Sequence, residues 1–214
     1  MTALRGGVCI TDLPLSQSGE TGVSIQTERL PIPVETERLL LRPFVANDFE
    51  DLCAFQTLPA VARYRYAEPR SREETRALLD GWLCNGGFEA DDDKLLLAVA
   101  LKDKGRVIGQ VGLTLRSARD RQGEIGFLMH PDFHGRGLAG EACLTLLDLG
   151  FKHLALHRVY GRCNARNTAS ARLMERLGLR REAELHENKF VKGEWTSELI
   201  YAALGREWTQ SRAD

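Results

Sequence analysis

The chain has 214 residues, of which 43% are hydrophobic and 28% are charged, and its formal net charge is -1 at pH 7. This composition is typical of one globular domain with a substantial core, and the length leaves little room for a second domain. The small net charge excludes a general attraction to nucleic acid or to anionic membranes, so we expect neither as a partner. Any basic site must be local.

The cysteines are odd in number and lack paired C-x-x-C spacing, so neither a disulfide framework nor a zinc site is predicted. They are Cys9, Cys53, Cys84, Cys143 and Cys163. The N-terminus lacks the charged-then-apolar pattern of a signal peptide, and no apolar run reaches the length of a membrane span. The cytoplasm is the expected compartment, and no metal is expected.

The first 33 residues mix Gly, Ser, Thr and Pro without a sustained hydrophobic period, and we predict an extension there. The tetrapeptide T-E-R-L occurs at 27–30 and again at 36–39. Prolines follow the first copy and cannot donate to a strand ladder, so the second copy is predicted to open the first strand. The predicted domain spans residues 34–206, and 207–214 form a tail.

Two helices are predicted next. Asn47 is expected to cap the first, and Ser71 with Glu74 forms a capping box that opens the second. Between them lies a loop rich in aromatic residues and arginines, which contains Tyr64 and Tyr66. This loop is either a packed connector or one wall of a pocket for an acceptor substrate.

A hairpin of two strands is predicted at residues 95–115, and a further strand follows near 123–130, where apolar residues alternate until Pro131 ends the strand. From Leu138 the apolar residues recur at helical spacing, so a helix must begin within Gly135-Arg136-Gly137. Glycines let the backbone approach an oxyanion, and the first N–H groups of a helix lack intrahelical acceptors. This junction is therefore predicted to cradle a phosphate.

A fifth strand near 158–163, a helix at 167–177 and two last strands at about 180–190 and 195–204 complete the chain. The segment from His134 to Ala139 resembles the Q/R-x-x-G-x-G/A pyrophosphate loop of the GNAT superfamily, the acetyl-coenzyme-A-dependent N-acetyltransferases. The segment from Asn164 to Gly178 resembles the N-x-x-N-x-x-S-x-x-x-x-E-K-L-G segment of the same superfamily. T-x-R-L-x-L-R-P at 36–43 resembles the opening of the branch that contains the RimJ- and RimL-type acetyltransferases of ribosomal-protein N-termini.

These resemblances imply the GNAT fold, an α/β (α+β) architecture. We expect a mixed, mostly antiparallel sheet of about seven strands, flanked by about four helices and splayed between strands 4 and 5. The resemblance also implies acetyl transfer from acetyl-coenzyme A to a primary amine, first of all a protein or peptide N-terminus. A small amine, such as an antibiotic, a polyamine or an amino-acid derivative, is the second alternative. A non-catalytic module that binds acyl-coenzyme A and regulates a partner is the third.

The acceptor is expected beside Tyr64, Tyr66 and Trp195. An open cleft there favours a peptide, and a closed acidic pocket favours a small amine. Trp195 is alternatively a core residue or a dimer contact, so a homodimer is left open.

The diphosphate of coenzyme A is expected at the glycine junction, and a strand edge is expected to hydrogen-bond the amides of its arm. An N–H near Leu128 or Met129 is expected to meet the oxyanion. Arg172 and Arg176 lie one helical turn apart and contact either phosphate or solvent. The predicted cofactor-binding residues are Phe127, Leu128, Met129, His134, Gly135, Arg136, Gly137, Leu138, Ala139, Gly140, Asn167, Ser170, Arg172 and Arg176.

Acyl transfer to an amine needs a route for the amine proton. Glu124 is the first candidate base, acting through water, unless it is instead paired with an arginine such as Arg116 or Arg121. Glu187 or His186 is the second candidate.

The resemblance places Asn167 against the arm of coenzyme A and Ser170 near the thioester sulfur as a proton donor. Alternatively, Asn164 or Asn167 caps the following helix and Ser170 is a small residue of its first turn. Met174 stands where many relatives have the tyrosine thought to protonate the leaving thiolate, which favours Ser170 or solvent. His134 stands where Gln or Arg is usual and supplies less charge to a phosphate.

Overall fold

A computed structural model of the chain describes residues 30–84 and 87–210. The strands are β1 (Val34–Glu35), β2 (Leu39–Arg42), β3 (Lys94–Leu101), β4 (Val107–Ser117), β5 (Gln122–Met129), β6 (Arg158–Asn164), β7 (Arg180–Val191) and β8 (Glu194–Leu204). The helices in this part of the chain are α1 (Phe49–Gln56), α2 (Pro59–Ala62), α3 (Arg72–Leu83), α4 (Leu138–Asp148), α5 (Thr168–Arg176) and α6 (Gly205–Gln210). Short 3-10 or π turns lie at Ala46–Asp48, Pro131–Phe133 and Leu149–His153.

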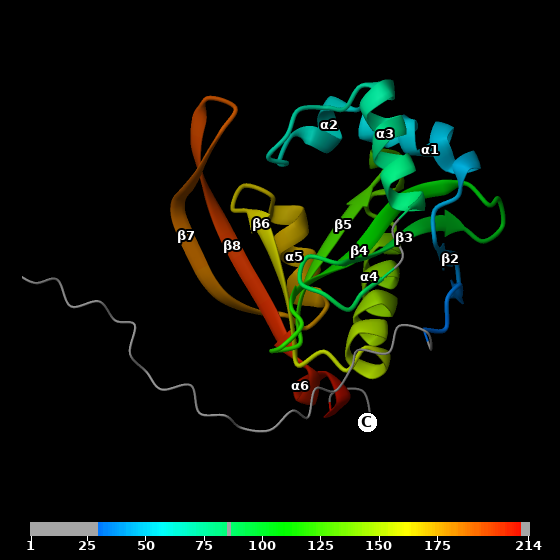
Figure 1. Ribbon diagram of the computed structural model, residues 1–214. Coiled ribbons are helices and arrows are strands. Elements are labelled where there is room, and N and C mark those ends of the chain that lie inside the picture. The colour runs from blue at the N-terminus through cyan, green and yellow to red at the C-terminus, as the bar shows by residue number, and fades with distance from the viewer. Residues whose placement is uncertain (1–29, 85–86, 211–214) are drawn as a thin grey trace, which may run out of the picture.

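The strands form one sheet in the order β1-β2-β3-β4-β5-β6-β8-β7 (Figure 1). All neighbours are antiparallel except β5 and β6, which are parallel. The predicted fold class, a mixed and mostly antiparallel sheet flanked by helices, is confirmed. The sheet has one strand more than the expected seven because of the two-residue β1, and α2 and α6 are additional to the four expected helices.

Helices cover both faces of the sheet. On one face α4 and α5 cover the sheet, and Leu146 of α4 lies in the same apolar cluster as Val111 and Leu113 of β4. On the other face Leu52 of α1 and Leu79 of α3 share a second apolar cluster with Ala98 of β3. Each fully buried leucine contributes roughly 1.5–3 kcal/mol of transfer free energy. The sheet is thus held between two apolar layers.

One predicted cap is present and the other is wrong. Ser71 Oγ accepts from the N–H of Glu74 (3.1 Å) and the Glu74 carboxylate accepts from the N–H of Ser71 (2.7 Å), as the capping box requires. Asn47 lies within a 3-10 turn, and Asp48 is the residue that precedes α1. Asp48 is buried with both carboxylate oxygens 2.7 Å from the guanidinium of Arg42, so this ion pair fixes where the helix begins.

The C-terminal helix α6 crosses the predicted domain boundary at residue 206. Its Trp208 is buried, lies 5.4 Å from the ring of Phe151 and donates to Asp148 (2.7 Å). The domain limits themselves remain predictions, and residues 1–29 of the predicted extension lie outside the described residues. No helix in the described ranges is long and apolar enough to cross a bilayer.

Candidate active site

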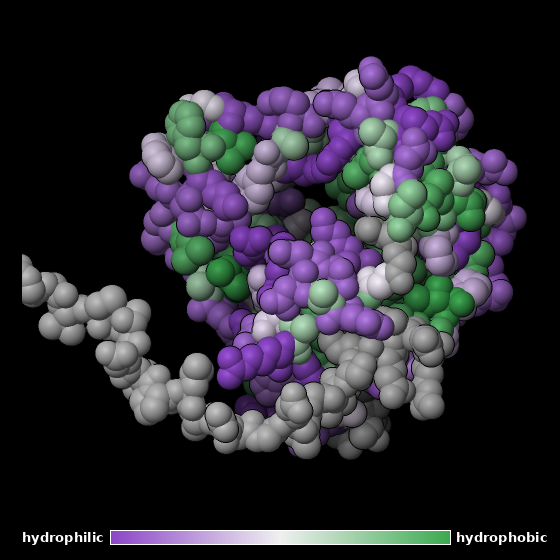
Figure 2. Space-filling model, viewed as in Figure 1, coloured by the Kyte–Doolittle hydropathy of each residue, from purple (hydrophilic) through white to green (hydrophobic). Residues whose placement is uncertain are grey.

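The sheet opens between β5 and β6. These strands pair only where Gln122–Glu124 faces Arg158–Tyr160, and beyond that point the two ribbons separate (Figure 1). Figure 2 shows a hollow in the surface at this place, below α2. Because β1 is an additional strand, β5 and β6 are the fourth and fifth strands of the expected sheet, and the predicted splay is confirmed.

The edge of β5 offers donors to this opening. The N–H of His130 donates to the carbonyl of Ile108 on β4 (2.8 Å). Because successive residues of a strand direct their backbone groups to opposite sides, the N–H groups of Phe127 and Met129 point toward β6. No residue of β6 is paired with them, so an extended amide arm can bind there as an added strand does. By the same alternation the N–H of Met129 points into the opening and that of Leu128 toward β4, and contact of either with an oxyanion remains a prediction.

The turn from β5 into α4 has the geometry of an anion site. Gly135 (φ 73°) and Gly137 (φ 76°) both adopt left-handed backbone conformations that other residues avoid, and Gly137 is the N-cap of α4. The first helical bond runs from the N–H of Glu141 to the carbonyl of Gly137 (3.1 Å). The N–H groups of residues 138–140 therefore lack intrahelical acceptors, and the positive end of the helix dipole lies beside them. This arrangement fits a diphosphate.

A clamp from the turn between β1 and β2 holds this junction in place. Glu141 of α4 accepts from Thr36 Oγ1 (2.5 Å) and from the N–H and Nε of Arg38 (2.9 and 2.7 Å). Arg38 Nη1 also donates to the carbonyl of Arg136 (2.9 Å). The second T-E-R-L copy predicted the start of a strand and carried the resemblance to the RimJ- and RimL-type branch, but it did not predict this contact. The sequence offered one signal for this contact, an acidic residue, Glu141, in the first turn of the helix.

The remaining predicted cofactor residues lie near this end of the sheet. His134 is exposed, and its Nε2–H donates to the carbonyl of Met129 (3.0 Å), so it positions the strand end. Asn167 caps α5 by accepting from the N–H of Ser170 (3.1 Å), which confirms the capping alternative. Arg172 and Arg176 are exposed and form no ion pair with any described residue. Contacts of these side chains with coenzyme A remain predictions.

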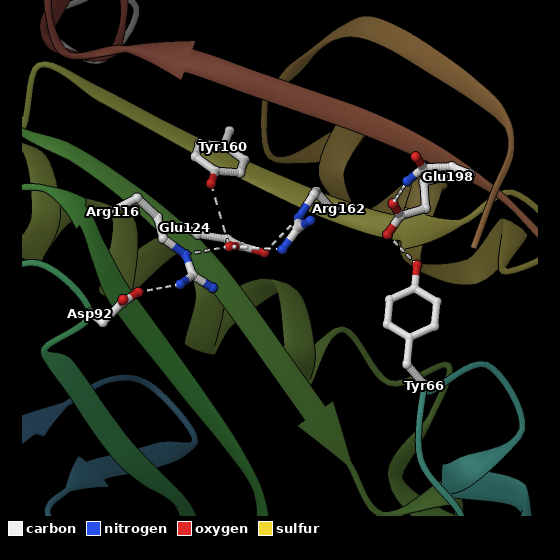
Figure 3. Close-up of polar contacts among 8 residues, drawn as sticks. Tyr66, Asp92, Arg116, Glu124, Tyr160, Arg162 and Glu198 are labelled. Carbon is white, nitrogen blue, oxygen red and sulfur yellow. Dashed lines mark hydrogen bonds and ion pairs between the residues drawn. The ribbon is translucent and has the colours of Figure 1, made fainter. Parts of the chain in front are cut away.

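Glu124 lies at the base of the opening, where β5 and β6 part (Figure 3). It accepts from Arg116 Nε (2.7 Å) and Arg162 Nε (2.9 Å), with the hydroxyl of Tyr160 at 3.5 Å. Burial alone would raise the pKa of Glu124, but the hydrogen bonds and charges of Arg162 and Arg116 outweigh burial and lower it.

The predicted pairing of Glu124 with Arg116 is therefore present, and Arg162 is the second partner in place of Arg121. A carboxylate with a lowered pKa is a weak proton acceptor. The role of Glu124 as the base remains a prediction, and its surroundings weigh against it.

A second carboxylate, missed in the sequence, lies nearby. Glu198 of β8 is fully buried and accepts from the hydroxyl of Tyr66 and from Asn188 Nδ2 (Figure 3). Burial and the hydrogen bond to Glu198 raise the pKa of the Tyr66 phenol, so it stays protonated and donating. The signal in the sequence was one glutamate within the otherwise apolar end of the last strand.

The other predicted residues are less centrally placed. Glu187 and His186 are exposed on β7, where the register against β8 shifts, and no hydrogen bond joins either to Glu124 within the described residues. Trp195 is 57% exposed and lies against Phe190 (5.4 Å between ring centroids). Its core alternative is therefore wrong. Tyr64 is partly buried beneath the guanidinium of a neighbouring arginine.

The loop before α3 and the β7–β8 hairpin meet above the opening. Lys192 Nζ donates to the carbonyl of Ala62 (2.8 Å), and Lys189 Nζ lies 4.8 Å from the centre of the Tyr66 ring. Together with the contact between Tyr66 and Glu198, these bonds join segments from opposite ends of the chain. The opening between β5 and β6 is thus bordered by the predicted acceptor loop.

Residues 38–180 match the family model described as acetyltransferase (GNAT) domain. Bacillus subtilis YnaD, an uncharacterized N-acetyltransferase, is 29% identical over 82% of this chain and 98% of its own length. Bacillus subtilis YdaF, a putative ribosomal N-acetyltransferase, is 30% identical over 49% of this chain and 57% of its own. The spermidine N(1)-acetyltransferase of Escherichia coli K12 is 25% identical over 72% of this chain and 80% of its own.

A crystal structure of a GNAT-family acetyltransferase from Bacillus anthracis superimposes with a TM-score of 0.72 at 28% identity, covering 81% of this chain and 98% of that one. Fold, cradle and splayed strands together define an acyltransferase that uses acetyl-coenzyme A. The chain belongs to the GNAT acetyltransferase family and is an acetyl-coenzyme-A-dependent N-acetyltransferase. No group of three or more His, Cys, Asp or Glu is arranged to hold a metal in the described part of the chain.

Proposed function

We propose that the enzyme acetylates the N-terminal amine of a protein or peptide. The observation that supports this acceptor most directly is the exposure of predicted acceptor residues at the opening. A cavity of about 330 Å³ between β5 and α3 has no carboxylate among its lining residues, and Tyr66 and Trp195 are 43% and 57% exposed. The resemblance to the RimJ- and RimL-type branch and to the putative ribosomal acetyltransferase YdaF agrees with it.

The chemistry follows from the donors of the opening. The amine nitrogen attacks the thioester carbon, and the N–H of Met129 is placed to stabilise the carbonyl oxygen as it becomes negative. The carbon–sulfur bond then breaks, and the thiolate, whose conjugate acid has a pKa of about 8.5, takes a proton from Ser170 or from solvent. Met174 is 1% exposed and packs against β6, so it leaves the acid role to one of these groups.

The amine must be neutral when it attacks. An α-amino group has a pKa of about 7.7–8.0, whereas a lysine side chain has one of about 10.4, so an N-terminus needs far less help to lose its proton. A weak base suffices for such a substrate. Glu124, held ionised by two arginines, and Glu198, buried behind Tyr66, are the carboxylates available to receive the proton through water.

A polyamine is the second candidate, since the spermidine acetyltransferase of Escherichia coli is a relative of this chain. A polycation requires unpaired carboxylates for recognition. Glu124 is paired with two arginines and Glu198 is buried, so neither of these two carboxylates is exposed and unpaired for a polyamine to bind. The third alternative, a non-catalytic module, is set aside because the chain is an N-acetyltransferase, whereas cytoplasmic location and a homodimer remain predictions.

Thiol release from acetyl-coenzyme A tests the proposal. The panel contains peptides with a free N-terminus, the same peptides with a blocked N-terminus and a free lysine, and spermidine. We expect release with free N-termini and much less with the other two. Faster release with spermidine than with free N-termini would refute the peptide assignment. Gly137→Glu is the inactive control, because it places a carboxylate at the predicted phosphate site and should prevent coenzyme A from binding.

A further inference from the structure

The cavity beside β5 is cationic. Its lining includes Arg65, Arg70 and Lys94, together with glutamines and apolar residues, and no aspartate or glutamate. Neither Arg65 nor Arg70 forms an ion pair with a described residue, although ion pairs hold many other arginines of this protein. Two half-buried guanidinium groups thus share a cavity without an anion to offset their charge.

A buried glutamine holds the two arginines side by side. Gln56 Oε1 accepts from Arg65 Nη1 (2.9 Å) and from Arg70 Nη1 (3.1 Å), so both groups converge on one oxygen atom. Gln56 Nε2 donates to Gln110 Oε1 of β4 (2.8 Å), and its backbone carbonyl accepts from the N–H of Arg70 (3.2 Å). Gln56 is 1% exposed. The hydrogen bonds through Gln56 therefore hold both guanidinium groups against the sheet.

Holding like charges together costs free energy. Burial first, and then the neighbouring Arg70 charge, lower the pKa of Arg65. Such a pair is retained most readily when an anion occupies the site during function, because planar guanidinium groups bind a carboxylate through two parallel hydrogen bonds.

The cavity also borders the reacting end of the opening. Gly126, Phe127 and Leu128 of β5 form part of its wall, next to Met129, whose N–H is proposed above to stabilise the oxyanion. The α4 cradle packs on the opposite face of the sheet. The diphosphate and the cavity arginines therefore approach β5 from different sides, and the arginines are not needed for the phosphates of coenzyme A.

We infer that the acceptor amine carries a carboxylate close to its nitrogen, and that Arg65 and Arg70 bind this carboxylate. This inference rests on the proposed function and narrows its substrate class. The carboxylate belongs to an acidic side chain near the peptide N-terminus; the α-carboxylate of a small amino acid has the same chemistry, and a preference for it would replace the peptide assignment. The same two guanidinium groups serve either source.

Matched acceptors test the inference by thiol release from acetyl-coenzyme A. One pair of C-terminally amidated peptides differs only in Glu or Gln at the second position, and the other pair is a free amino acid and its amide. We expect kcat/KM to be at least about 10-fold higher for the carboxylate member of one pair, as a charge-assisted bond implies. The pair that shows the preference identifies the source.

The variant Arg65→Gln/Arg70→Gln should reduce this ratio to about 1 while leaving the affinity for acetyl-coenzyme A unchanged. Arg63→Gln removes the same charge from an exposed side chain outside the cavity and should keep the ratio. Equal rates within both pairs for the wild-type enzyme, or a preference that survives the double variant, would overturn the inference but not the peptide assignment. No release with any amine would refute the proposed function, and the inference with it.

Discussion

Replacing Glu141 by Gln tests whether the α4 cradle is held by the clamp of Thr36 and Arg38, in the turn between β1 and β2. Glu141 accepts from Thr36 and from the backbone and guanidinium of Arg38, and only 16% of its side chain is exposed. A glutamine of the same shape must turn an NH₂ group toward one of these donors. At least one charge-assisted hydrogen bond is then lost, which costs about 1.5–3 kcal/mol of the free energy of unfolding.

For a domain of this size the loss corresponds to a decrease in Tm of about 3–12 °C, measured by circular dichroism. Arg38 also fixes the carbonyl of Arg136 in the cradle. A looser cradle must be ordered when the diphosphate binds, so we expect Kd for coenzyme A, measured by calorimetry, to rise about 2- to 10-fold.

The effect should depend on pH. The hydrogen bonds from Thr36 and Arg38 outweigh burial and lower the pKa of Glu141 below its ordinary value of 4.5. A lowered folded-state pKa gives stability that is present above the unfolded value and is lost as pH falls through the folded value. The difference in Tm between wild type and Glu141→Gln should therefore be constant near neutral pH and shrink below about pH 4.5.

Glu50→Gln is the matched control. Glu50 pairs with Arg72 at 2.6 Å, but both side chains are well exposed (72% and 60%). Exposed pairs contribute little, so this variant should change neither Tm nor Kd. If Glu141→Gln behaved like Glu50→Gln, the clamp would have no role in holding the cradle.

Two further predictions concern the backbone and the second carboxylate. Gly135→Ala and Gly137→Ala should each cost about 1–2 kcal/mol in urea unfolding because of their left-handed backbone; a β-carbon at Gly137 would also lie 3.4 Å from the guanidinium of Arg38, whereas at Gly135 it would meet nothing within 4 Å. Gly137→Ala should therefore raise Kd for coenzyme A more than Gly135→Ala does. Equal Kd values for the two variants would count against placing the diphosphate at the N-terminus of α4. Tyr66→Phe removes one donor to Glu198, so we expect about 1.5–3 kcal/mol lower stability; an unchanged urea midpoint would show that this bond contributes nothing.

The local features of the site could be predicted from the sequence. Three patterns depend only on neighbouring residues: the alternation up to Pro131, the helical spacing from Leu138, and the glycines between them. The structure has β5, the turn and α4 where these patterns predict them. The capping box at Ser71 has the same local origin. Such patterns determine backbone geometry without reference to the rest of the chain.

The contacts that complete the site could not be predicted in this way. Tyr66 meets Glu198 across 132 positions of sequence, and Arg38 meets Glu141 across 103. Each depends on how a loop or strand packs on the sheet, which no local pattern encodes. Glu124 shows the same limit, since its second arginine comes from β6 and not from the adjacent turn.

A crystal structure of the full chain with coenzyme A tests the central claim most directly. We expect the diphosphate oxygens within hydrogen-bonding distance of the N–H groups at residues 138–140, with the arm along Phe127 and Met129 in the opening between β5 and β6. A diphosphate bound anywhere else, or an arm outside that opening, would contradict the account.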